Sequence, residues 1–390
     1  MAEELSGEEP QGPERPPAPS AGRLRLPRPP LGWPVALTVL FLLVFLLVVY
    51  YLVSAPVRDK QARLPTAPPS AQPFIQQGDD LFAKGRVEEA MAAYSQALSL
   101  EPNNARALAH WGWALTVRGK TGEAIERLRR ASEAEPANAE YHALLALAYD
   151  WSEQYDRAYA EAQAGLRADA NNARVQAALA EVLADTGRPQ EAVEAGRKAV
   201  AAAPNSPDAH RAHGYALHMA GDLAKGAEEM RRAVQLAPNL VYLRLALGAL
   251  YRSADMYPEA LAEFQKVVDL EPFNAQGHEG LGSVYYRRQE YAAAIPYFEK
   301  AAALDPKRFL SENYLAWSHY LSEHYDLAVP HFQRALEIDA NRPETHAGLG
   351  WALLNMKLNE PAQAAFEKAL ALNPDLKLAK DGLAALTARR

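Results

Sequence analysis

Residues 272–306 read PFNAQGHEGLGSVYYRRQEYAAAIPYFEKAAALDP, and this stretch begins and ends with prolines that stand 34 residues apart. The same spacing recurs along most of the chain. The prolines on this grid are Pro102, Pro136, Pro204, Pro238, Pro272, Pro306 and Pro374, and its two remaining positions hold Ala170 and Ala340. A fixed period of this length is typical of stacked-repeat proteins. The grid predicts nine units over residues 71–376, without an insertion or deletion.

Two further positions in every unit carry only small side chains. Twenty-four residues before each grid position lie Gly78, Gly112, Ala146, Ala180, Gly214, Gly248, Gly282, Ala316 and Gly350. Twelve residues before it lie Ala90, Ala124, Ala158, Ala192, Gly226, Ala260, Ala294, Ala328 and Ala362. A backbone can approach its neighbour closely only where no larger side chain holds the two apart. We therefore expect two close helix contacts in every unit.

Between these positions each unit reads as two helices joined by a turn. Gly85, Gly119, Gly187 and Gly221 mark the turn in four units, where a residue with positive φ is useful. The grid proline then ends the second helix, because it lacks an amide hydrogen and clashes with the preceding turn. The pattern predicts an all-α solenoid of nine helix–turn–helix units, in which each unit contacts only its neighbours.

The units resemble the tetratricopeptide repeat. In the stretch quoted above the family's pattern is carried by Leu281-Gly282, Tyr285, Ala294, Phe298, Ala301 and Pro306. The resemblance covers about four-fifths of the chain and implies a right-handed superhelical solenoid, whose first helices line a concave groove. The third and fourth units depart from the pattern, because Ala162 and Gly196 stand where later units have phenylalanine. We expect a softer joint there.

The resemblance also implies a set of candidate partner-binding residues in the groove. These are Trp113, Trp151, Arg211, Tyr215, Tyr242, Arg252, Tyr286, Trp317, Tyr320 and Trp351. Tyrosine, tryptophan and arginine commonly anchor protein interfaces, so one interpretation is a groove for an extended peptide or a partner helix. The alternative is that several of the rings pack against adjacent helices, because large aromatic side chains serve cores as often as interfaces.

Three segments precede the repeats. Residues 1–32 hold eight prolines and few large apolar side chains, so we expect a disordered tail. Residues 33–53, WPVALTVLFLLVFLLVVYYLV, carry no charge and would span about 32 Å as a helix, which predicts a single-pass transmembrane helix. A cleaved signal peptide is the alternative, although its apolar core is normally only about 7–15 residues long. Residues 54–70 hold four prolines and are predicted to form an extended linker.

The charges that flank the apolar run bear on its orientation. Arg15, Arg23, Arg25 and Arg28 precede it, whereas Arg58, Lys60 and Arg63 follow it together with Asp59. Positive residues favour the cytoplasmic side, and this slight excess places the repeats on the extracytoplasmic side of the membrane. At the other end, residues 377–390 carry leucines among charged residues. We expect a short amphipathic helix that caps the solenoid.

The sequence offers little chemistry. The absence of cysteine excludes disulfides and thiolate metal sites. His210, His213 and His218 fall at positions that face neighbouring helices, and we interpret them as structural rather than as metal ligands. No nucleophile elbow, zinc-protease motif or acid–base pair is recognised, so we predict no catalytic residue, no cofactor and no small-molecule substrate. Residues 71–390 carry 34 basic and 42 acidic side chains, which argues against nucleic acid as a partner.

The sequence therefore predicts a membrane-anchored scaffold or adaptor that is not an enzyme. It would bind protein partners through the concave groove and the lipid bilayer through residues 33–53. Bacterial proteins of this layout resemble assembly factors for envelope complexes, which suggests a role in assembling a membrane complex. A second interpretation is a non-catalytic subunit that regulates a membrane enzyme or presents its substrate.

Overall fold

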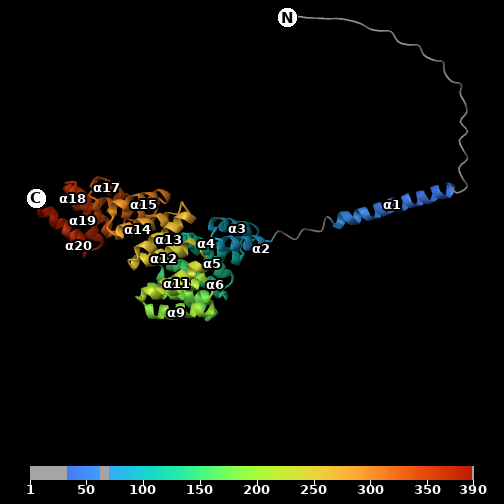
Figure 1. Ribbon diagram of the computed structural model, residues 1–390, viewed down its shortest axis with the longest axis horizontal. Coiled ribbons are helices and arrows are strands. Elements are labelled where there is room, and N and C mark those ends of the chain that lie inside the picture. Colours follow the sequence, from blue (N-terminus) through green and yellow to red (C-terminus); the bar gives the residue numbers. More distant parts are fainter. Residues whose placement is uncertain (1–32, 62–69, 389–390) are drawn as a thin grey trace, which may run out of the picture. The chain divides into compact units, whose positions relative to one another are not determined.

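The computed structural model describes residues 33–61 and 70–388, which form twenty α-helices and no strand (Figure 1). The prediction of an all-α chain is confirmed. The helices are α1 Trp33–Gln61, α2 Gln72–Ala83, α3 Val87–Leu100, α4 Ala105–Val117, α5 Thr121–Ala134, α6 Ala139–Asp150, α7 Tyr155–Ala168, α8 Ala173–Asp185, α9 Pro189–Ala202, α10 Pro207–Met219, α11 Leu223–Leu236, α12 Val241–Ser253, α13 Tyr257–Leu270, α14 Ala275–Arg287, α15 Tyr291–Leu304, α16 Phe309–Leu321, α17 Tyr325–Ile338, α18 Pro343–Asn355, α19 Asn359–Leu372 and α20 Lys377–Ala388.

α1 is the one described helix that is long and apolar enough to cross a membrane, over Val35–Val53. A signal sequence near the N-terminus would meet the same criterion. The large apolar side chains of this stretch point outward all around the helix and are not covered within it. α1 continues to Gln61, so the first part of the segment predicted to be an extended linker is helical. Extending an existing helix avoids the cost of nucleating a new one. The tail predicted at residues 1–32 lies outside the described residues.

α2 to α19 pair into nine repeats, in which the even-numbered helix comes first and the odd-numbered helix second. The same turn position adopts positive φ in all nine repeats. It holds Gly85, Gly119, Gly187 and Gly221, as the sequence predicts, and also Glu153, Asp255, Gln289, Glu323 and Lys357, with φ between 56° and 87°. Five repeats therefore hold a larger residue in the left-handed conformation, which persists only because the two helices around it fix the turn.

A large side chain of the second helix fills the small position of the first helix in the same repeat. A Cβ atom added at Gly78 would lie 2.3 Å from the Tyr94 ring, and one added at Gly350 would lie 2.6 Å from Phe366. Phe264 also meets Gly280 of the next repeat, where an added Cβ would lie 2.3 Å away. These contacts explain why Gly78 and Gly350 are glycine, because no Cβ atom fits beside the ring of the second helix.

The third and fourth repeats compensate for their smaller side chains by closer helix packing. Ala162 and Gly196 are both buried. A Cβ atom at Gly196 would lie 2.7 Å from the Cα atom of His213 on α10. The first helices α6, α8 and α10 also make the most extensive contacts between first helices. Because these side chains are short, the helices lie closer together here. Backbone atoms occupy the space that a larger side chain would fill.

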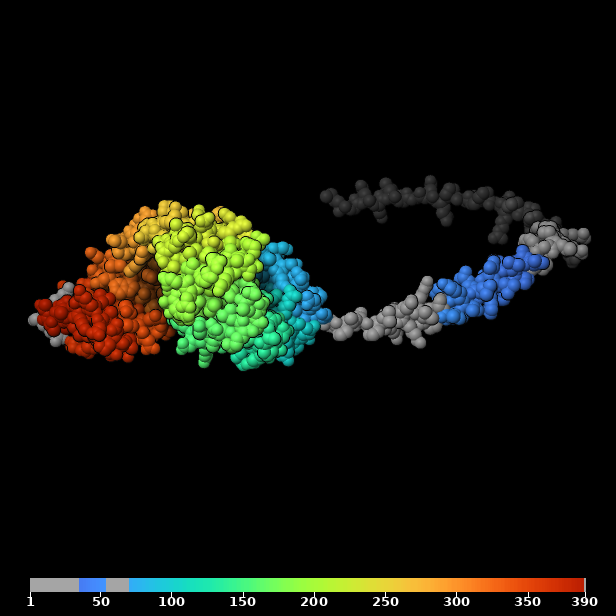
Figure 2. Space-filling model, turned by 90° about the horizontal axis from the view of Figure 1, so that it is seen from below, coloured from blue at the N-terminus to red at the C-terminus, as the bar shows by residue number. Residues whose placement is uncertain are grey.

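The prediction that each repeat contacts only its neighbours is wrong. Arg118, in the turn of the second repeat, lies 2.7 Å from Glu271 in the loop before α14. The Trp113 ring on α4 lies 5.9 Å from the ring of Tyr242 on α12. The first repeats curve tightly enough to meet the loops around the sixth repeat. These contacts close the superhelix on itself, and we call this region the closed part of the solenoid. Figure 2 shows the C-terminal repeats, in orange and red, running away from it.

Replacing Gly196 with alanine (Gly196→Ala) should destabilise the solenoid, because α9 and α10 would have to separate to admit the methyl group. Overpacking of this kind typically costs about 1–3 kcal/mol. We expect a lower urea midpoint for the full-length chain in detergent, followed by circular dichroism. Gly122→Ala on α5 is the matched control, because a Cβ atom there meets nothing within 4 Å. Equal stability of the two variants would contradict the close approach of α9 and α10.

Candidate functional site: the inner face of the solenoid

The first helices line the inner face of the solenoid, because those of successive repeats pack on one another from α2 to α18. An ionic ladder runs along this face. Arg174 Nε lies 3.2 Å from Glu140 Oε1, and Arg174 Nη1 lies 3.3 Å from Asp208 Oδ2. Asp208 in turn accepts a hydrogen bond of 2.5 Å from the Tyr242 hydroxyl. Each partner comes from the next first helix, so the ladder ties α6, α8, α10 and α12 together.

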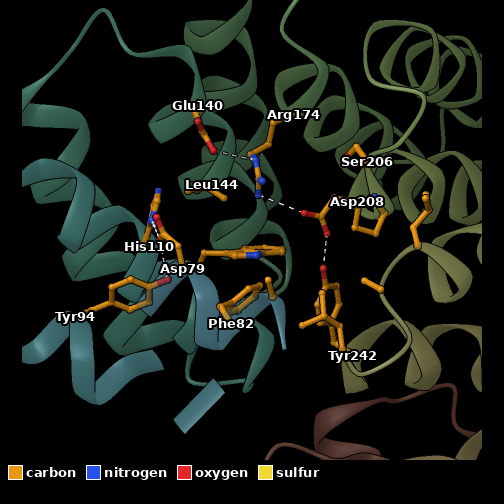
Figure 3. A pocket seen from close by; sticks show the side chains of 16 residues that line it. Asp79, Phe82, Tyr94, His110, Glu140, Leu144, Arg174, Ser206, Asp208 and Tyr242 are labelled. Carbon is orange, nitrogen blue, oxygen red and sulfur yellow. Dashed lines mark hydrogen bonds and ion pairs between the residues drawn. The ribbon is translucent and has the colours of Figure 1, made fainter. Parts of the chain in front are cut away.

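A cavity of about 410 Å³ lies between this ladder and the first repeat, where α12 closes the turn of the superhelix. Phe82, Trp113, Leu144, Leu240 and Tyr242 form its apolar lining. Figure 3 shows Glu140, Arg174 and Asp208 along one side of the cavity, and Asp79, Tyr94 and His110 at the other. The cavity thus has an apolar wall between two groups of polar side chains.

Asp79 is the centre of the second polar group. Its carboxylate accepts hydrogen bonds from Tyr94 and Arg106, and His110 Nδ1 lies 2.5 Å from Oδ1. Burial opposes ionisation of Asp79, but the hydrogen bonds from His110 and Tyr94 and the charges of His110 and Arg106 outweigh it and lower its pKa. The carboxylates of Asp79 and Asp208 are therefore already engaged by side chains of the same chain.

Five of the ten candidate groove residues are held inside this closed part. Arg211 donates hydrogen bonds of 2.9 and 2.6 Å to the two oxygens of Glu181, and Trp151 Nε1 donates to the same carboxylate. The hydroxyl of Tyr215 donates to Asp185. Trp113 and Tyr242 are less than 9% exposed and pack against each other across the inside of the superhelix. These side chains stabilise the fold, as the alternative interpretation of the sequence allows.

The other five candidates lie on α12, α14, α16 and α18. They are partly exposed, as Trp151 and Tyr215 also are. Trp317 packs edge-on against Phe332, with Tyr320 at 5.6 Å, and Tyr286 packs edge-on against Tyr314. Trp351 donates a hydrogen bond of 3.0 Å from Nε1 to the backbone oxygen of Leu378 on α20. The structure spaces these residues along the inner face, one repeat apart, and does not gather them at one point.

The ladder residues Glu140, Arg174 and Asp208 are absent from the set of candidates predicted from the sequence. A signal for them exists, because Arg106, Glu140, Arg174 and Asp208 occupy one repeat position and alternate in charge. Side chains of opposite charge at the same position of stacked repeats face each other, so this alternation predicts an ionic ladder.

Four of the histidines share one kind of structural partner, a backbone oxygen of the preceding loop. His142, His210, His278 and His346 share one repeat position, and in each the Nε2 atom lies between 2.9 and 3.1 Å from the backbone oxygen six residues earlier. They tie each first helix to the loop that precedes it. Among the described residues, no three histidine or carboxylate side chains are grouped as a metal site requires.

Asp150 at the end of α6 is buried without a hydrogen-bond partner for either carboxylate oxygen. Burial raises its pKa to about 9, and the nearby carboxylates of Glu181 and Asp185 act in the same direction. At neutral pH this side chain is a neutral acid beside two other acidic groups.

The comparisons identify the family. Models described as tetratricopeptide repeat match residues 81–148, 173–216, 245–309 and 343–376, which together make up more than half of the chain. The chain therefore belongs to the tetratricopeptide repeat family. No curated protein matches it. Tetratricopeptide repeats are protein-interaction modules, and the family places this chain among interaction scaffolds.

Two solved structures share the fold at low sequence identity. A chain of the APC/C hetero-tetramer Cut9–Hcn1 is 18% identical over 77% of this chain, with a TM-score of 0.60. This chain spans only 58% of the length of that one. The human IFIT1 dimer with m7Gppp-AAAA is 17% identical over 84% of each chain, with a TM-score of 0.56. At these identities the likeness is one of fold alone.

Asp150 should make the solenoid less stable as the pH rises. The unfolded chain ionises this carboxyl near its ordinary value of 3.8, whereas the folded chain keeps the proton to about 9, so ionisation between these values favours unfolding. Asp150→Asn removes this contribution, and we expect the free energy of unfolding at pH 8, relative to that at pH 5, to be higher in the variant than in the wild type. Guanidinium titrations in detergent at the two pH values measure it.

The matched control for this experiment is Asp156→Asn, on the exposed first turn of α7. It should leave the difference between the two pH values unchanged. A pH dependence that is the same in wild type and Asp150→Asn would contradict a buried neutral acid at this position.

Proposed function

We propose that this chain is a membrane-tethered scaffold that binds a protein partner on the inner face of its sixth to ninth repeats and supports the assembly of a membrane or envelope complex. The observation that carries this proposal is the contrast between the two halves of the inner face. In the second to fifth repeats, side chains of the inner face form the ion pairs of the ladder or pack inside the closed part of the superhelix. Tyr286, Trp317 and Tyr320 are partly exposed and contact other aromatic rings rather than a carboxylate.

The exposed half has the composition of an interface. Tyrosine and tryptophan supply large, rigid contact areas and commonly act as interface anchors. The three rings are held in place by neighbouring rings, since Tyr286 contacts Tyr291 and Tyr314, and Tyr320 contacts Tyr325. A surface whose side chains are already ordered loses little conformational entropy when a partner binds.

Support for the tether comes from α1. Its stretch Val35–Val53 has the length and apolar composition of a membrane span, and its large side chains are uncovered in the described chain. Placing α1 in a bilayer would remove these side chains from water. Such an anchor would keep the repeats close to the membrane, on the extracytoplasmic side if the flanking arginines decide the orientation.

The tether can be tested by extraction. We expect the full-length chain to stay with membranes in alkaline carbonate at its full mass of 42.8 kDa. Replacing Leu43 and Val44 with arginine should release it, because each arginine at mid-span costs about 2.5–3.5 kcal/mol of insertion free energy. Leu310→Arg, at an exposed position of the repeats, is the control and should stay in the pellet. Release of the wild type, or a shorter chain that has lost α1, would overturn the tether.

The location of the partner can be tested by photo-crosslinking in intact membranes. A benzophenone amino acid at Tyr320 or Trp317 should form a specific adduct with a partner protein. The same amino acid at Lys300, exposed on the second helix α15, is the control and should give no adduct. Adducts of equal yield from all three positions, or from Lys300 alone, would move the partner away from the inner face. Protease added to intact cells would establish which side of the membrane the repeats occupy.

A further inference from the structure

Arg252 on α12 reaches the inner face without a carboxylate partner. Its Nη1 atom donates a hydrogen bond of 2.7 Å to Ser283 Oγ on α14, and no ion pair joins it to an acidic residue within the described chain. The side chain is partly buried, and burial lowers the pKa of its guanidinium. A positive charge in such a place is stabilised by an anion that approaches from outside.

Other arginines near the inner face have acidic partners. The pairs are Arg106 with Asp79, Arg174 with Asp208, Arg211 with Glu181, Arg287 with Asp255 and Arg308 with Glu279. The charge of Glu279 acts on Arg252, but this carboxylate is held by Arg308 through two hydrogen bonds. Arg252 therefore has no carboxylate of its own within ion-pair distance among the described residues, in a chain whose net charge is −7.

Arg252 belongs to a row on the inner face. Tyr286 and Tyr320 occupy the same repeat position in the seventh and eighth repeats, each 34 residues further along the chain. Tyr314 lies beside Tyr286, and Trp317 lies beside Tyr320. The row therefore presents one cation followed by two aromatic sites.

We infer that this row binds an acidic and apolar segment of a partner protein, with a carboxylate on Arg252 and apolar side chains on Tyr286 and Tyr320. The inference rests on the proposed function and adds the chemistry of the partner. A guanidinium matches a carboxylate in shape and charge and binds it through two parallel hydrogen bonds. The aromatic rings favour apolar side chains on the same segment. A nucleic acid is disfavoured, because its successive phosphates need several free cations.

The spacing of the row defines the segment further. Neighbouring packed helices lie about 10 Å apart, and an extended chain advances about 3.3 Å per residue. Contacts with successive repeats therefore fall about three residues apart on an extended partner. The expected motif has an aspartate or glutamate, an apolar residue about three positions away and a second one about six positions away.

The test is a selection with the full-length chain in lipid nanodiscs. A display library of random dodecapeptides is panned against the wild type, Arg252→Glu and Arg252→Met, the last of which keeps an apolar stem and guards against misfolding. Arg129→Glu, on the exposed side of α5, is the matched charge control. Circular dichroism melting confirms that each variant is folded. A selected peptide carrying a fluorescent label is then titrated against each variant by anisotropy.

We expect wild type and Arg129→Glu to enrich the acidic and apolar motif. Arg252→Glu should weaken binding of the selected peptide at least tenfold and enrich lysine or arginine at the acidic position, and Arg252→Met should weaken it without that reversal. Identical selections from wild type and Arg252→Glu, an absence of enrichment, or enrichment of neutral or basic peptides would overturn the inference. If a single-stranded RNA dodecamer displaces the labelled peptide, the inference is also overturned, because Arg252 would then bind a phosphate rather than a carboxylate.

The outcome separates this inference from the proposed function. If Trp317→Ala and Tyr320→Ala abolish binding of the selected peptide while Arg252→Glu does not, the inner face binds protein and the role of Arg252 fails. If none of these variants affects the peptide, it binds elsewhere, and both the inference and the proposed binding surface fail.

Discussion

Each repeat depends on one contact, in which a side chain of the second helix sits against a glycine or alanine of the first. The pairing of Tyr94 with Gly78, of Leu128 with Gly112 and of Phe366 with Gly350 leaves no room for a Cβ atom. Where the second helix offers only Gly196, backbone itself fills the space. The size of this side chain therefore sets how closely neighbouring helices approach, and the approach of many helices in succession sets the curvature of the solenoid.

That curvature divides the inner face into two chemically different halves. In the first half the superhelix closes, so that Arg118 reaches Glu271 and Trp113 reaches Tyr242. Glu140, Arg174 and Asp208 on this side find their partners within the chain, and these ion pairs bound the cavity that remains. In the second half the first helices are not covered by another turn, and Tyr286, Trp317 and Tyr320 stay within reach of a partner.

The division explains which predictions from the sequence succeed. The helix pairs, their order and the glycine turns are set by contacts within a single repeat, so the 34-residue pattern reveals them. The positive φ at Glu153 and Lys357 is not visible in the sequence, because those residue types do not mark such a turn. The ten candidate groove residues share similar repeat positions but have different environments. Trp113 is buried and Tyr320 is partly exposed, because only Trp113 faces a second turn of the superhelix.

The sequence by itself determines the repeating unit of this protein, since a proline or alanine grid and two small positions suffice to specify a pair of packed helices. It also marks α1 as an apolar run of membrane length. Only the tertiary structure decides which side chains of the inner face are engaged in contacts within the chain and which are accessible to a partner. The reason is physical: contacts such as Arg118 with Glu271 join residues more than four repeats apart, and they arise from the accumulated rotation of every repeat between them.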